Sequence, residues 1–193
     1  KRITDKASDK FSHYLRFKND AIMISSKTLN IDNPRLNCRL KGYEHFSPKR
    51  IILDKSLDIS LKSYIFKSAK KNNTIIFYNS LNKSKIKVLK KKGIILIKSE
   101  LNNNKQFDLK KILKKIYMTG VRNLLLEGGD RVTQSFLKER LINQFYLFKS
   151  PKKLSKSKKY ITFTSINILN NEYNTKFKIS SKLAKDTITI YKR

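Results

Sequence analysis

Apolar residues recur along this chain with two different periods, and their alternation predicts a fold of mixed helices and strands. Helical spacing comes first, over residues 5–18, with Thr4 as a candidate N-cap. The apolar face of that helix comprises Ala7, Phe11, Tyr14 and Leu15. Short apolar runs, typical of buried strands, stand at residues 21–24, 50–53, 74–78 and 94–97, with a lysine-rich helix or loop between the last two. A further amphipathic helix is expected after Asp108, with Gly120 at its C-terminal cap.

In its last third, the chain changes from alternating helices and strands to strands alone. A strand is predicted over residues 121–126, the pair Gly128-Gly129 follows, and a helix is predicted through Val132, Phe136 and Leu137. Strand-like patterns occupy residues 144–149, 161–169, 173–179 and 187–191, and residues 151–159 have the composition of a loop. We therefore predict one α/β domain over residues 1–193, with a central mixed, mostly parallel sheet flanked by helices and antiparallel strands at its C-terminal end.

Composition narrows the classes of partner. The 193 residues are 39% hydrophobic, enough for one buried core, and carry a formal net charge of +31. Such a charge is typical of nucleic-acid binding, but the lysines are spread over every segment rather than collected into a stripe. A solvated lysine-rich surface is the preferred interpretation, and no nucleic-acid partner is expected. A basic RNA-binding module is the alternative from a different class, although the chain has no RNP-type aromatic motif.

Metal and membrane binding are disfavoured. Cys38 is the single cysteine, and His13 and His45 are the two histidines, so no Cys/His metal cluster can be assembled. No apolar run approaches the roughly 20 residues that span a bilayer, and no signal-peptide pattern opens the chain. We expect no metal, no membrane contact and a cytoplasmic location.

The clearest candidate for chemistry is the predicted turn from a strand into a helix at Glu127-Gly128-Gly129. Two glycines let the backbone approach a ligand, and the free amides of the next helical turn suit an anion such as pyrophosphate. A glycine pair in such a turn is also often purely structural. Glu127 stands at the carboxyl end of a strand, where open α/β sheets bind ligands, so it could orient a hydroxyl or exchange a proton. Capping of the following helix is the alternative role for its carboxylate.

A second group of polar residues follows the first strand. We expect residues 27–39 to form a loop, and its polar side chains include Thr28, Asp32, Arg35 and Arg39. Asp32 precedes Asn33-Pro34, so a simple turn is the alternative role for its carboxylate. Arg16 projects from the first helix on the side away from Phe11 and could reach the same ligand. A guanidinium is suited to that task because its planar fork grips phosphate or carboxylate.

Several motifs stand in the order and approximate spacing of one family. They are Leu15-Arg16, Asp20-Ala21-Ile22, Thr28-Leu29, Asp32-Asn33-Pro34-Arg35-Leu36, Arg39, Arg50-Ile51-Ile52-Leu53-Asp54 and Leu126-Glu127-Gly128-Gly129. On these residues, nearly the whole chain resembles the C-terminal reductase domain of the bifunctional riboflavin-biosynthesis deaminase/reductase. The resemblance implies a dihydrofolate-reductase-like fold and NADPH-dependent reduction of 5-amino-6-(5-phosphoribosylamino)uracil, in which the ribose ring opens and its C1 accepts hydride. A reductase of the 2,5-diamino-6-ribosylamino-pyrimidinone phosphate is the neighbouring alternative.

The resemblance also implies roles for particular residues. Substrate contacts fall on Arg16, Leu36, Arg39 and Glu127. Cofactor contacts fall on Thr28, Asp32, Lys55, Gly129, Asp130, Arg131, Val132, Thr133, Gln134 and Ser135. Glu127 and Asp32 are the candidate catalytic groups. Lys55 replaces a small hydroxyl residue of the family pattern and could instead meet the 2′-phosphate of NADPH.

The same resemblance implies partners. Members of the family commonly form homodimers, and the bifunctional members carry an N-terminal zinc deaminase domain, so we expect a homodimer and such a fusion in the parent chain. The H-x-E and C-x-x-C signature of that deaminase is absent from this sequence, so the chain itself is expected to need no zinc. The family's first strand has no counterpart before Lys1, so we expect the chain to be a fragment.

Overall fold

The computed structural model describes residues 5–151, 163–179 and 185–193. Its contacts divide the chain into two compact units. The parallel-sheet unit comprises residues 14–129, and the antiparallel-sheet unit comprises the described residues of 1–13 and 130–193. The first helix, α1 (Lys6–Lys18), contributes to both. A single domain over residues 1–193 stays a prediction.

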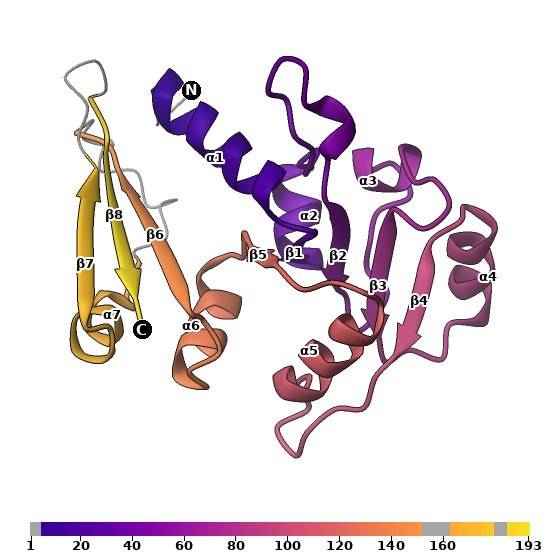
Figure 1. Ribbon diagram of the computed structural model, residues 1–193. Coiled ribbons are helices and arrows are strands. Elements are labelled where there is room, and N and C mark those ends of the chain that lie inside the picture. Colours follow the sequence, from indigo (N-terminus) through magenta and orange to yellow (C-terminus); the bar gives the residue numbers. More distant parts are fainter. Residues whose placement is uncertain (1–4, 152–162, 180–184) are drawn as a thin grey trace. The chain divides into compact units, whose positions relative to one another are not determined.

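The parallel-sheet unit contains five parallel strands in the order β4-β3-β2-β1-β5 (Figure 1). They are β1 (Ala21–Ser25), β2 (Lys49–Leu53), β3 (Thr74–Tyr78), β4 (Ile95–Lys98) and β5 (Leu124–Leu126). The apolar runs of the sequence are these strands, and β1 to β3 are buried almost throughout. Because all the strands run the same way, their carboxyl ends meet at one side of the sheet, which we call the carboxyl edge.

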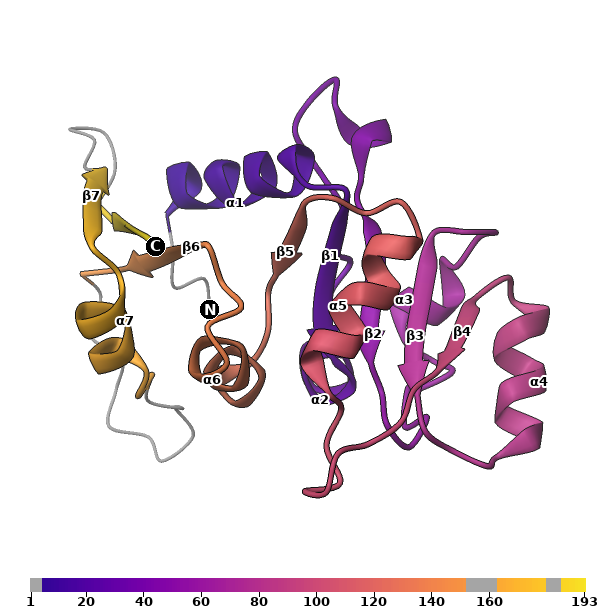
Figure 2. The same ribbon diagram turned by 60° about the horizontal axis from the view of Figure 1, so that its bottom comes forward.

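Helices cover both faces of this sheet. α2 (Ser26–Asp32), α3 (Tyr64–Lys67) and α4 (Lys83–Lys91) contribute Leu29, Ile65 and Leu89 to a buried cluster that includes Ile22, Ile24, Ile52 and Ile76. The alternate strand residues, which point to the opposite face, are also buried: Met23, Ile51, Ile75 and Phe77. A short 3₁₀ helix, η1 (Glu44–Phe46), precedes β2, and α5 (Leu109–Met118) is seen in front of the strands in Figure 2.

The antiparallel-sheet unit pairs three strands in the order β6 (Gln144–Lys149), β8 (Thr187–Lys192) and β7 (Thr175–Ile179). Its helices, besides the start of α1, are α6 (Asp130–Lys138) and α7 (Ile166–Glu172). A buried cluster of Leu137, Leu169, Tyr173 and Tyr191 joins these helices to the sheet. The expected parallel strands, flanking helices and C-terminal antiparallel strands are confirmed, but the described strands form two separate sheets rather than one mixed sheet.

Two of the sequence-based predictions of local structure are wrong. The segment predicted as a loop over residues 27–39 begins as α2, because the Ser25 hydroxyl accepts the Thr28 amide at 3.3 Å and caps a helix. The strand predicted over residues 161–169 is replaced by α7 from Ile166 onward. Residues 161–162, most of the expected loop at 151–159, and Thr4 lie outside the described residues.

Asp20 joins the starts of β1 and β5. Its Oδ2 atom accepts the backbone amides of Arg122 and Asn123 at 2.8 Å each, and its own amide donates to the Asn123 carbonyl at 3.0 Å. These hydrogen bonds, that from Asn123 above all, hold the pKa of the Asp20 carboxyl below its usual value. β5 is therefore fixed beside β1 just ahead of the polar residues that follow it.

Candidate functional site

Arg16 and Glu127 form a two-point ion pair next to the end of β5. The Nε atom of Arg16 donates to Oε1 of Glu127 at 2.8 Å, and Nη2 donates to Oε2 at 2.8 Å. Nη1 donates to the Asn37 carbonyl at 3.3 Å. The side chains are 15% and 30% exposed, so the pair is partly shielded from water yet reachable. Since a guanidinium has five N–H groups, two of those on Arg16 are left for an anionic ligand.

Glu127 is held in place by the sheet as well as by Arg16. Its amide donates to the Met23 carbonyl at 3.0 Å and so continues the pairing of β5 with β1. Both carboxylate oxygens face the guanidinium fork, an arrangement that favours orientation of Arg16 over the alternative role of capping α6. The predicted substrate residues Arg16 and Glu127 are thus brought together.

Thr28 and Gly129, both predicted to contact the cofactor, also meet at the carboxyl edge. The Thr28 hydroxyl lies 3.1 Å from the Ser25 hydroxyl, and a Cβ atom built on Gly129 would stand 3.2 Å from that same Thr28 oxygen. Glycine at 129 therefore permits a close approach that a larger residue would hinder. Because α2 is a helix, Asp32 follows Thr28 by four positions and lies on the same helical face.

The structure changes what Leu36, Arg39 and Asp32 can do. The Leu36 side chain is 2% exposed and belongs to the core of the parallel-sheet unit, so backbone groups are what it can offer a substrate. Its φ of 52° is unusual for a leucine and indicates local strain. Arg39 is exposed and donates to the Asn37 Oδ1 atom at 3.0 Å. Asp32 is exposed at the end of α2, and its catalytic role stays a prediction.

Residues 130–135 begin α6 and belong to the antiparallel-sheet unit. Oδ2 of Asp130 accepts the side-chain amide of Gln134 at 2.9 Å, and that amide also contacts the Thr164 hydroxyl. Ser135 donates to the Arg131 carbonyl at 3.0 Å, while Thr133 is buried and Val132 half-buried. A role for these side chains in holding cofactor phosphates therefore stays a prediction.

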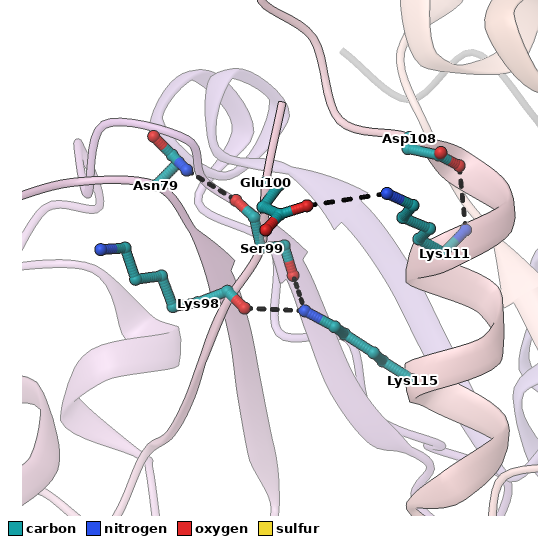
Figure 3. Close-up of a pocket in the computed structure, with 7 residues that line it drawn as sticks. All are labelled: Asn79, Lys98, Ser99, Glu100, Asp108, Lys111 and Lys115. Carbon is teal, nitrogen blue, oxygen red and sulfur yellow. Dashed lines mark hydrogen bonds and ion pairs between the residues drawn. The ribbon is translucent and has the colours of Figure 1, made fainter. Parts of the chain in front are cut away.

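The loops after β2, β3 and β4 add residues to the carboxyl edge. Lys55 is exposed, and its Nζ atom donates to the Lys105 carbonyl at 3.1 Å. A pocket of about 620 Å³ lies beyond β3 and β4 (Figure 3). It is lined by Asn79, Lys98, Ser99, Glu100, Asp108, Lys111 and Lys115. The sequence carried no signal for it, because its lining comes from separate segments.

The polar groups of this pocket largely satisfy one another, as the dashed lines of Figure 3 show. Lys115 donates to the Lys98 carbonyl at 2.8 Å and to the Ser99 hydroxyl at 3.1 Å. Lys111 lies 3.6 Å from Glu100, and both side chains are well exposed. In the part of the chain that the structure describes, no group of three His, Cys, Asp or Glu side chains is arranged to hold a metal ion. Every helix there is too short or too polar to cross a bilayer.

Solved structures resemble this fold. Acinetobacter baumannii RibD superimposes with a TM-score of 0.72 at 19% identity, covering 100% of this chain and 51% of that one. The diaminohydroxyphosphoribosylaminopyrimidine deaminase/5-amino-6-(5-phosphoribosylamino)uracil reductase of Thermotoga maritima does so with a TM-score of 0.69 at 23% identity, covering 100% and 50%. The likeness confirms the expected dihydrofolate-reductase-like fold.

Sequence comparison also finds relatives that are proteins of riboflavin biosynthesis. Riboflavin biosynthesis protein RibD of Aquifex aeolicus is 32% identical over 194 residues, which cover 100% of this chain and 52% of that protein. The 2,5-diamino-6-ribosylamino-4(3H)-pyrimidinone 5′-phosphate reductase of the same organism is 27% identical over 152 residues, covering 77% and 64%. The chain spans about half or less of the RibD relatives it matches. The family described as the RibD C-terminal domain matches residues 1–189. This chain belongs to the RibD C-terminal domain family.

Proposed function

We propose that this chain is a reductase of riboflavin biosynthesis. It would use NADPH to convert the ribosyl group of 5-amino-6-(5-phosphoribosylamino)uracil into the ribityl form. Family membership supports the reaction class, and the observation that carries the proposal is the Arg16–Glu127 pair at the end of β5, with Gly129 and the Thr28 hydroxyl close together beside it. β1 and β5 are paired strands, so the two sets of residues adjoin.

The residues present fit a nicotinamide dinucleotide. Gly129 lets the turn after β5 lie close to the Thr28 hydroxyl, and Thr28 and Asp32 present polar groups on one face of α2. Lys55 supplies an exposed cation at the same edge, suited to a 2′-phosphate. When bound, the cofactor would supply hydride to C1 of the opened ribose.

The protein's own task is to align and polarise the substrate. The two spare N–H groups of Arg16 suit a phosphate or carbonyl oxygen of the substrate, and Glu127 fixes the direction in which that guanidinium points. Glu127 and Asp32 are the candidates for handling the proton that ring opening requires. The engagement of both Glu127 oxygens with Arg16 suits Glu127 to orientation, and the exposed Asp32 to proton exchange.

A second substrate is supported by a specific observation. One relative, 27% identical over 77% of this chain, is named a reductase of the 2,5-diamino-6-ribosylamino-4(3H)-pyrimidinone 5′-phosphate. The two substrates differ on the pyrimidine ring, whereas Arg16 and Arg39 would bind the shared phosphoribosyl group.

We further propose a homodimer, fusion to an N-terminal zinc deaminase domain in the parent chain, and a cytoplasmic location.

The direct test is NADPH oxidation with each of the two substrates in turn. It should be run on this chain and on a version extended at its N-terminus as in the longer relatives. Turnover of one substrate is expected, and reduction of neither by either version would reject the proposal.

Lys55→Ala should weaken NADPH binding about tenfold and leave NADH binding unchanged, since a phosphate contact of about 1.4 kcal/mol would be lost. Salt-sensitive RNA binding without NADPH binding would favour the RNA-binding alternative.

A further inference from the structure

Asp54 is a carboxylate buried at the carboxyl end of β2. It is 0% exposed, and the groups that hydrogen-bond to it are uncharged. Oδ1 accepts the Asp58 amide at 2.8 Å and Oδ2 accepts the Ile59 amide at 2.8 Å, and the Ser26 side chain lies close enough to lower the pKa of the carboxyl. Burial is the strongest influence on this carboxyl and raises its pKa above the usual value. Burying such a group without a cation is costly, and the loop amides that it accepts offset part of that cost.

Asp54 interacts with two segments of the carboxyl edge. Asp58 and Ile59 belong to the loop after β2, which also carries Lys55. Ser26 is the first residue of α2 and stands two positions before Thr28. One buried carboxylate therefore connects the loop after β2 with the first turn of the helix after β1.

The loop after β2 contains a residue with a strained backbone conformation. Leu57 has a φ of 60° and is 3% exposed, and its amide donates to the Asp54 carbonyl at 3.2 Å. A left-handed backbone at leucine is sparsely populated, so the surrounding bonds must hold it there. Asn30 of α2 adds a second connection, donating to the Asp58 carbonyl at 2.9 Å and accepting the Ser60 amide at 3.1 Å.

We infer that Asp54 is a positioning residue for the cofactor, because it fixes the loop of Lys55 relative to the helix of Thr28. This inference rests on the proposed function, in which Thr28 and Lys55 contact different parts of NADPH. A dinucleotide that spans both would meet a surface already in its binding geometry and would lose less free energy in ordering it. Asparagine has the same shape but one acceptor oxygen, so Asp54→Asn would turn an amide group toward an N–H donor.

Arg50 provides a matched control at the opposite end of the same strand. It is 6% exposed and donates to the Thr74 hydroxyl at 3.0 Å, the Ser68 hydroxyl at 2.7 Å and the Asn73 Oδ1 atom at 2.9 Å. Arg50→Lys would therefore break a buried polar network of similar size, but at the amino end of β2, away from Thr28 and Lys55. The Arg50→Lys variant therefore shows how a loss of stability by itself changes the affinity for the cofactor.

The experiment measures dissociation constants for NADPH and NADH together with thermal melting. The chain has no tryptophan, so the cofactor's own emission can be followed without indole interference. Asp54→Asn is expected to raise the NADPH dissociation constant about tenfold and the NADH constant less, because the Lys55 contact is lost with loop geometry. Ser26→Ala, a milder change, should shift NADPH binding in the same direction, and the double variant should fall short of the sum. Arg50→Lys should lower the melting temperature while leaving both constants within about twofold.

Amide hydrogen exchange gives a readout that needs no cofactor. In Asp54→Asn, exchange should speed up in both residues 26–28 and residues 55–59, whereas Arg50→Lys should leave these segments unchanged. Unaltered NADPH affinity in Asp54→Asn, or an equal loss in Arg50→Lys, would overturn the inference while the proposed function stands. If the unaltered chain bound no NADPH, the proposed function would fail, and the inference with it.

Discussion

Arg16 and Glu127 stand 111 positions apart in the sequence and meet through two hydrogen bonds of 2.8 Å. Local structure does not bring the two residues together, since Arg16 lies on α1 and Glu127 follows β5. Their pairing depends on β5 lying beside β1, which the Glu127 amide and the Asp20 carboxylate both secure. The orientation of the Arg16 guanidinium is thus set by the pairing of two strands.

Replacing Glu127 by Gln should lower turnover much more than it changes cofactor affinity. The amide keeps one acceptor oxygen but loses the charge that holds the guanidinium fork, so we expect turnover to fall about tenfold or more and the NADPH constant to stay within about twofold. Steady-state kinetics and cofactor titration provide the two measurements. Glu100→Gln, which alters an exposed acid 3.6 Å from Lys111, is the matched control and should change neither. Unchanged kinetics in Glu127→Gln would remove Glu127 from the catalytic role.

Gly129→Ala should weaken NADPH binding, because the new methyl group would stand 3.2 Å from the Thr28 hydroxyl. Either the turn or the first turn of α2 must then shift, and a rise of about tenfold in the dissociation constant is expected. Thr28→Ala removes the obstructing oxygen, so adding Gly129→Ala to it should cost much less. Equal penalties in the two backgrounds would show that the contact between these residues does not set the geometry.

The stability contributed by Asp20 should depend on pH. Because its pKa is lowered on folding, the contribution is complete above the usual value of 3.8 and is lost as the pH falls through the lower, folded-state pKa. Asp20→Asn should therefore reduce the melting temperature near neutral pH, and the difference from the unaltered chain should shrink in acid. Glu139→Gln changes an exposed acid just after α6 and serves as the control, with little effect at either pH. A difference that stayed constant into strong acid would contradict the assignment.

Leu169→Ala should destabilise the chain by about 2–5 kcal/mol, since it would leave a cavity in a packed core. Leu169 is 0% exposed and packs with Leu137, Tyr173 and Tyr191. Asn167→Ala lies on the exposed side of α7 and should change stability by less than about 0.5 kcal/mol. Denaturant titration would show the contrast, and it also tests the helix, because a strand over 161–169 would place residues 167 and 169 on the same face.

Much of the parallel sheet and its flanking helices could be predicted, because their signals are local. The Asp108 side chain accepts the Lys111 amide and caps α5, and Gly120 follows the end of α5 with a φ of 87°, as the sequence indicates. α2 was missed because Ser25 is both the last residue of β1 and the N-cap of α2, so the helix follows the strand without an intervening loop. α7 was missed because the spacing of Ile166, Leu169 and Tyr173 fits a helix, while β-branched residues in the same stretch favour a strand.

The candidate site was predictable residue by residue but not as an arrangement. Arg16 and Glu127 each carried a signal, yet nothing in the sequence says that they bond to each other. Asp54 was visible as the end of a strand, whereas its link to Ser26 arises only when α2 packs beside β2. Leu36 illustrates the limit most clearly, because a buried side chain and a left-handed backbone cannot be read from its neighbours.

The two buried charged residues at the ends of β2 also bear on how the sheet assembles. A slip of β2 by one residue against β1 would exchange the faces of all its side chains. Arg50 would then leave the Ser68, Asn73 and Thr74 oxygens at one end, while Asp54 would leave its two amides at the other. Each misplaced group would sit in apolar surroundings without a partner, so a misaligned strand is penalised at both ends at once. We therefore expect refolding to proceed without a trapped intermediate in which β2 is out of register.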